Sequence, residues 1–212
     1  MTSWQAALVA ALAFASNSKN NLQGGKSAAA PVTTKNGDKG SSRLFSGETL
    51  PKDDIHFEVL GNLDELSSLT GLIRTRLDPQ FSSLNTDLRE IQKILHDIMA
   101  ACATNPASPQ WDKLPLISQD TVNWLEAAQE AIKSQTNIAP GFVIPGDQGP
   151  VAAWLDFGRA VARRCERSFS AFAASGAASQ QESWQANTLL TRQFLNRLSD
   201  FMFIAARYAG SR

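Results

Sequence analysis

The chain has few of the residues that metal centres and nucleophilic active sites require. Among 212 residues there are two cysteines and two histidines. The cysteines form no zinc pattern, and no Glu-x-x-His motif is present, which argues against a ferritin-like di-iron centre. A Ser-His-Asp site is hard to build from two histidines, and none of its sequence patterns occurs. We therefore expect any chemistry to come from positioned reactants rather than from a nucleophile of the protein.

The chain also lacks net charge, with 20 basic and 20 acidic residues. Bulk electrostatics thus predicts neither a nucleic acid nor a membrane as a partner, so anion binding must come from local clusters. Cys102 and Cys165 both lie in helical patterns, which predicts buried free thiols in a reducing compartment.

The N-terminal stretch has no acidic residue before Asp38 and no apolar run that could span a bilayer, since Trp4–Ala15 is too short. We predict that residues 1–31 are an extension, either disordered or targeting. As a transit peptide it would place the protein in the mitochondrion. Otherwise a cytoplasmic location is expected, and a cleavable secretory signal is a further alternative.

Strand-like alternation of polar and apolar residues is absent, and apolar residues recur instead at every third or fourth position. This spacing predicts helices over residues 59–77, 84–102, 122–132, 151–172 and 190–209. Asp53-Asp54 and Ser118 suit helix N-termini. Residues 32–212 are therefore predicted to form one all-α domain, an antiparallel five-helix bundle, after a loop over residues 32–52. Some apolar residues lie outside these periodic apolar faces of the helices and need other cover, which favours an oligomer: Phe157, Phe201 and Phe203.

The loop contains the segment Thr-Lys-Asn-Gly-Asp-Lys-Gly-Ser-Ser over residues 34–42. Its glycines permit a nest of backbone N–H groups, and its lysines and hydroxyls add donors for an anion. It is not a P-loop, because the required motif and a preceding strand are both missing. A flexible surface loop is the alternative.

In the fourth predicted helix, Arg159, Arg163 and Arg167 are spaced by four and share one face. Arg164 points elsewhere, and Glu166 can pair with Arg163. Such a density of fork-shaped donors suits phosphate oxygens. A solvated, salt-bridged helix face is the alternative.

Further polar residues lie on otherwise apolar helices. In the fifth helix Asn196 and Asp200 lie one turn apart, either as ligand contacts or as a buried polar network. In the first, Asp64 and Glu65 stand among apolar neighbours, where Asp64 can pair with an arginine of the fourth helix.

Taken together and in order, several motifs resemble the ATP:cob(I)alamin adenosyltransferases of the propanediol-utilisation (PduO) type, from about Val32 to Ala209. The matching segments are residues 34–42, 51–54, 64–68, 91–92, 142–146, 159–167, 194–200 and 206–209. Departures from the family pattern are Asn36 for threonine, Thr49-Leu50 for a basic pair, Gly146-Asp147 for a second glycine, and Asp156 where histidine is frequent.

The resemblance implies a homotrimer of five-helix bundles that binds ATP between subunits, with Mg²⁺ on the phosphates and the corrin beside it. The Co(I) of cob(I)alamin would attack the ribose C5′, transferring the 5′-deoxyadenosyl group and releasing triphosphate. A non-catalytic carrier or sensor of nucleotide and cobalamin is the alternative. A cobalamin-dependent acceptor enzyme is a possible partner.

The resemblance also implies site residues. The triphosphate would be wrapped by Thr34, Lys35, Asn36 and Gly37, with Ser42, Arg43 and Lys52 closing over it. Phosphates and ribose would be held from the next subunit by Arg163, Arg164, Cys165, Glu166, Arg167 and Asn196. Asp64 and Arg159 would pair across the subunit boundary and place the corrin, and Phe142 would be an apolar wedge beneath it. No residue is implied as a metal ligand.

Overall fold

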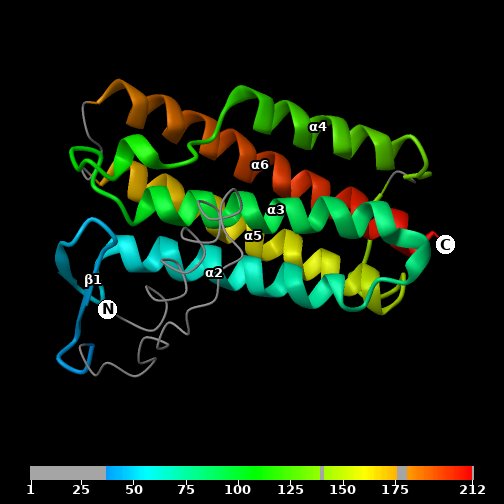
Figure 1. The fold of residues 1–212 in the computed structure, drawn as a ribbon. Coiled ribbons are helices and arrows are strands. Elements are labelled where there is room, and N and C mark those ends of the chain that lie inside the picture. Colours follow the sequence, from blue (N-terminus) through cyan, green and yellow to red (C-terminus); the bar gives the residue numbers. More distant parts are fainter. Residues whose placement is uncertain (1–36, 139–140, 176–180, 212) are drawn as a thin grey trace, which may run out of the picture.

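The computed structural model describes residues 37–138, 141–175 and 181–211. Within these ranges five long helices form a bundle, which confirms the predicted fold (Figure 1). They are α2 (Ile55–Arg74), α3 (Ser82–Cys102), α4 (Gln119–Lys133), α5 (Pro150–Ala174) and α6 (Glu182–Gly210), with 3₁₀ turns at Pro79–Phe81 and Trp111–Lys113. None of these described helices is long and apolar enough to cross a membrane.

Two helix starts follow from the capping side chains that the sequence predicted. Asp54 caps α2, where its Oδ1 accepts a hydrogen bond from the His56 N–H at 2.9 Å. Ser118 caps α4 in a reciprocal capping box with Thr121. Each cap satisfies an amide that the first turn of a helix leaves without an intrahelical partner.

Helix α5 is central, because it packs against both α6 and α2, while α3 covers α2 and α4 covers α6. Consecutive helices run in opposite directions, so α4 and α6, which pack together, run the same way (Figure 1). Phe201 is fully buried in the core of this chain, so its burial no longer favours an oligomer. Phe157 stays 49% exposed, and Phe203 is partly buried.

A small β-hairpin replaces part of the predicted loop. Strand β1 (Ser41–Arg43) pairs antiparallel with β2 (Thr49–Pro51). Three residues per strand are too few for alternation to be recognised in a sequence. Gly47, with φ of 110°, lies in the connecting turn, where a residue with a side chain would be strained. The hairpin sits at the end of the bundle where α2 begins and α3 ends (Figure 1).

Both cysteines are free and buried, as predicted. Burial raises the pKa of the Cys102 thiol far above its ordinary value and that of Cys165 to about 12. Both sulfurs are therefore protonated packing groups rather than reactive thiolates.

Candidate functional site

One face of α5 presents arginines without carboxylate partners. Arg163 and Arg167 are exposed, and Arg159 is half-buried. Within the described ranges none of the three forms an ion pair. Arg167 Nη1 donates to the Arg163 carbonyl at 3.0 Å, and Arg159 Nε is buried without a hydrogen-bond partner. An anion can therefore bind this face without first displacing an internal carboxylate.

Arg164 and Cys165 face α2 instead. Arg164 forms an ion pair with Glu65, and its Nε donates to Asn62 Oδ1 at 3.0 Å. The Cys165 thiol donates to the Asn62 carbonyl at 3.0 Å and is 0% exposed. Its side chain therefore lies in the core of this chain, and the predicted contact of Cys165 with a ligand stays a prediction. In this chain both residues tie α5 to α2.

Asn196 of α6 links two charged neighbours. Its Nδ2 donates to Glu166 Oε1 at 3.1 Å, and its Oδ1 accepts from Arg197 Nη1 at 2.9 Å. Arg197 is held in turn by Glu126 of α4, with a 2.8 Å Nε–Oε1 contact. Glu166 therefore faces Asn196 rather than Arg163, which corrects the expected Glu166–Arg163 pair.

Asp64 is exposed on α2, and its carboxylate has no ion pair or hydrogen bond among the residues that the structure describes. Its neighbour Glu65 is the residue that pairs with an arginine of α5. The predicted contact between Asp64 and Arg159 involves a second chain and stays a prediction.

A hollow of about 400 Å³ opens between α4, α5 and α6 beside the arginines. Arg159 and Arg163 line it from α5, Asp200 from α6 and Gln129 from α4. Gln129 Oε1 and Arg159 Nε are both buried without a partner among the described residues, so one acceptor and one donor on the same hollow are unsatisfied there. Each such group costs about 1–3 kcal/mol unless a ligand or water pairs with it. The remaining lining residues are Ile138, Ser199, Phe203 and Ile204.

A buried ion pair supports one wall of this hollow. Arg207 Nη2 lies 2.5 Å from Asp156 Oδ2, and both side chains are 4% exposed. The Arg207 guanidinium also lies over the Phe203 ring, 5.1 Å from its centroid. Because Phe203 lines the hollow, the pair fixes a side chain of the site.

The glycine-bearing loop is described only from Gly37 onward. Thr34, Lys35 and Asn36 lie outside the described residues. Ser42 is buried in β1, and Arg43 Nε donates to the Gly47 carbonyl at 2.8 Å. A Cβ at Gly37 would lie 3.0 Å from Lys52 Nζ, so the glycine lets this ammonium approach the loop backbone.

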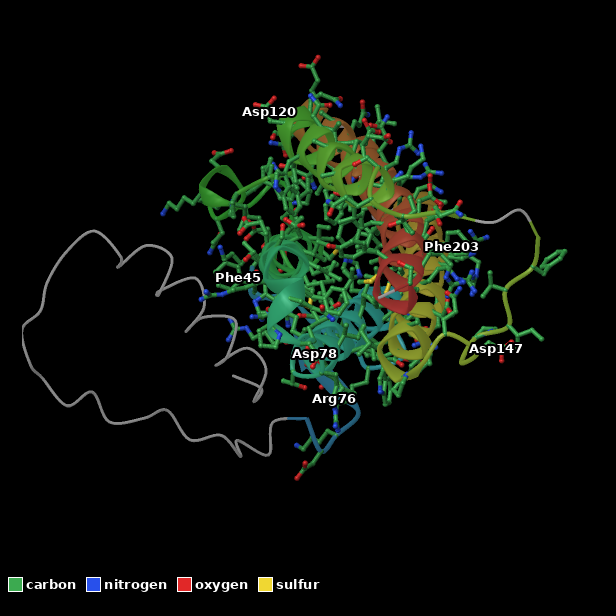
Figure 2. All side chains as sticks on the ribbon, turned by 90° about the vertical axis from the view of Figure 1, so that its right-hand side faces the viewer. Phe45, Arg76, Asp78, Asp120, Asp147 and Phe203 are labelled. Carbon is green, nitrogen blue, oxygen red and sulfur yellow. The ribbon has the colours of Figure 1, made fainter. Side chains whose placement is uncertain are left out.

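Phe142 is exposed in the segment that joins α4 to α5. Figure 2 shows this segment, labelled at Asp147, standing off the bundle on the side where Phe203 lies. A fully exposed aromatic side chain is suited to contact a ligand or another chain.

No cluster of three His, Cys, Asp or Glu side chains that could hold a metal ion occurs in the described part of the chain. His56 contacts Asp54, with 2.6 Å between Nδ1 and Oδ1, and His96 Nε2 lies 3.3 Å from Ser67 Oγ. The charged side chains that line the hollow are the guanidinium groups of Arg159 and Arg163 and the carboxylate of Asp200.

Fold and site together define the class: a helical-bundle protein with a cationic hollow suited to an anionic ligand. The family model for cobalamin adenosyltransferase matches residues 32–209. A corrinoid adenosyltransferase from Homo sapiens is 36% identical over 183 residues, covering 85% of this chain and 69% of the human protein. One from Bacillus subtilis is 33% identical over 181 residues, with coverages of 84% and 86%. The chain belongs to the cobalamin adenosyltransferase family.

Solved structures agree with this result. A variant of a PduO-type ATP:corrinoid adenosyltransferase from Lactobacillus reuteri, complexed with cobalamin and ATP, aligns with a TM-score of 0.72 at 30% identity. The alignment covers 85% of this chain and 91% of that one. The resemblance inferred from the sequence motifs is confirmed, and the chain is a transferase of this type.

Proposed function

We propose that this chain transfers the 5′-deoxyadenosyl group of ATP to cob(I)alamin, forming adenosylcobalamin and triphosphate, and that the arginine face of α5 receives the phosphates. ATP-dependent adenosyl transfer to cobalamin is the activity of the family. One observation supports the assignment of the phosphates: Arg163 lines the hollow and Arg167 follows it one turn later, and neither has a carboxylate partner in the described ranges. Arg164, Arg197 and Arg207, by contrast, each have a carboxylate partner.

The reaction requires the protein to stabilise the negative charge of the leaving triphosphate, and it does not require a nucleophile from the protein. The Co(I) centre supplies the electron pair of the new Co–C5′ bond, the C5′–O bond breaks, and triphosphate leaves with the bonding electrons. Negative charge grows on the leaving oxygen, where Arg163 and Arg167 can donate charge-assisted hydrogen bonds. Each such bond contributes about 1.5–3 kcal/mol. Glu166 and Asn196, already joined to each other, are assigned to the nucleotide.

The second wall of the phosphate site is assigned to the loop and the hairpin. Gly37, Ser42, Arg43 and Lys52, together with residues 34–36, would close over the triphosphate. Mg²⁺ fits this site as an ion carried by the phosphates, since the described residues hold no three-ligand group of their own. The protein would then contact the phosphates rather than build a metal cage.

A homotrimer would complete the site. Among the described residues the Asp64 carboxylate has no ion pair or hydrogen bond and the Arg159 guanidinium forms no ion pair, so their opposite charges would be complementary across a subunit boundary. Exposed Phe157 fits such a boundary. Phe142 would lie beneath the corrin, excluding water and the lower cobalt ligand. The extension over residues 1–31, the 32–212 domain, a mitochondrial location and an acceptor enzyme remain predictions.

A turnover assay tests the proposal. The full chain is incubated with ATP, Mg²⁺ and chemically reduced cobalamin, and both the corrin absorbance and triphosphate release are followed. We expect a cobalt–carbon bond and triphosphate in equal amounts, and neither when ATP is omitted. Binding of both ligands without a cobalt–carbon bond would establish the carrier or sensor alternative and refute the enzyme.

A further inference from the structure

A compact hydrogen-bonded cluster fastens the turn of the hairpin to the end of α3. Asn105 Nδ2 donates to Glu48 Oε1 at 2.9 Å, and Ser46 Oγ donates to Glu48 Oε2 at 2.5 Å. The Asn105 backbone N–H donates to Ser46 Oγ at 2.8 Å. The Phe45 N–H donates to the Ala103 carbonyl at 2.9 Å. The two sides of this cluster are 57–59 residues apart in sequence, so it fixes the hairpin in space rather than its local turn.

Glu48 is the charged centre of the cluster. Burial alone would raise the pKa of its carboxyl, but hydrogen bonds from Ser46, its own backbone and Asn105 hold that pKa below the ordinary value. The carboxylate is therefore ionised, and its hydrogen bonds are charge-assisted, which makes them stronger than those between neutral groups.

The cluster holds the hairpin whose strands contain or adjoin the proposed phosphate contacts. Strand β1 holds Ser42 and Arg43, and β2 leads directly to Lys52. We call the side-chain cluster of Ser46, Glu48 and Asn105 the clasp. The Leu44 N–H donates to the Glu48 carbonyl at 2.7 Å, so the turn that the clasp holds also sets the register of β1. Without the side-chain bonds of Glu48 and Asn105, the hairpin would keep its strand pairing and the Phe45–Ala103 backbone bond, but its turn would be held less firmly against the end of α3.

We propose that Glu48 and Asn105 are positioning residues that hold the hairpin where Arg43 and Lys52 can reach the triphosphate. They touch neither ATP nor the corrinoid. This inference rests on the proposed function, because it assumes that the hairpin forms one wall of the nucleotide site.

Steady-state kinetics of four variants of the full chain test it: Glu48→Ala, Glu48→Gln, Asn105→Ala and the control Glu90→Ala. Loss of the clasp should raise the KM for ATP about tenfold, corresponding to one lost charge-assisted hydrogen bond, and leave the KM for the corrinoid within about twofold. Glu48→Gln should recover most of the loss, since its amide oxygen still accepts from Asn105. Glu90, which pairs with Lys93 on the exposed side of α3, should behave as wild type.

A second readout needs no turnover. Limited trypsin digestion after Arg43 should be about tenfold faster in Glu48→Ala than in wild type or Glu90→Ala, while the helical circular dichroism is unchanged. Unaltered cleavage together with an unaltered KM for ATP would overturn the clasp. Equal rises in both KM values would also overturn it, because they indicate general damage. If wild type itself shows no transfer, the proposed function fails, whereas faster cleavage would still support the clasp.

Discussion

Removing one member of the buried pair Asp156–Arg207 probes how the hollow is held together. Both side chains are 4% exposed, and the contact is 2.5 Å. In Asp156→Ala, Arg207 keeps its charge and its position over Phe203 but loses its carboxylate, and its Nε already has no partner. Breaking a buried pair in this way costs about 3–5 kcal/mol. For a chain of this size the corresponding fall in Tm is about 6–20 °C.

Thermal and urea unfolding, followed by circular dichroism, measure this loss. The double variant Asp156→Leu/Arg207→Met should recover most of the stability, because no charge is then left buried alone. Glu126→Ala removes the exposed partner of Arg197 and should change the free energy of unfolding by about 1 kcal/mol or less. Equal, small losses of unfolding free energy in Asp156→Ala and Glu126→Ala would refute the view that the Asp156–Arg207 pair is shielded from solvent and required for stability.

Three further predictions follow from other parts of the molecule. Gln129→Leu removes a buried acceptor that has no partner among the described residues, so we expect little change in Tm. The KM for ATP or for the corrinoid should rise about threefold to tenfold. Unchanged KM values for both substrates would show that Gln129 is not part of the site. Burial, with a smaller contribution from a neighbouring glutamate, raises the pKa of Asp97 to about 6, so the stability of the folded chain declines as pH rises through about 4 to 6. Asp97→Asn should therefore be more stable than wild type by on the order of 1 kcal/mol at pH 8, with the difference shrinking toward pH 4 in urea titrations; a constant difference would contradict this. Cys102 and Cys165 should react with a thiol reagent at pH 8 only after denaturation, and prompt labelling of the native chain would show that they are not buried.

The helices could be predicted because each carries a long apolar stripe, and the exceptions have physical causes. Helix α6 begins at Glu182, although its stripe is recognisable only from Leu190. Asn187 lies at a buried position in the first turns of α6, which the sequence pattern did not predict. Its Oδ1 accepts a hydrogen bond from the Ile117 N–H at 2.9 Å. From sequence alone a polar residue is predicted to be exposed, because the distant partner that satisfies it in the core is not known. The hairpin escaped prediction because its strands are too short for a pattern.

From the spacing of residues along a helix, only the parts of the site that lie on one helix face could be predicted. Spacing by four placed Arg159, Arg163 and Arg167 on one face. Which arginines are paired depends on contacts between helices, as when Arg164 meets Glu65, 99 residues earlier in the chain. Gln129 was missed because its role comes from the packing of α4 over α6, which no local pattern records.

The most direct test of the phosphate assignment compares Arg163→Ala with Arg89→Ala, an exposed arginine of α3, in the cob(I)alamin assay. Because no carboxylate of the described chain pairs with Arg163, its removal should leave Tm within about 2 °C while lowering kcat/KM for ATP roughly tenfold to 200-fold. Arg89→Ala should match wild type. A wild-type kcat/KM in Arg163→Ala would contradict the account.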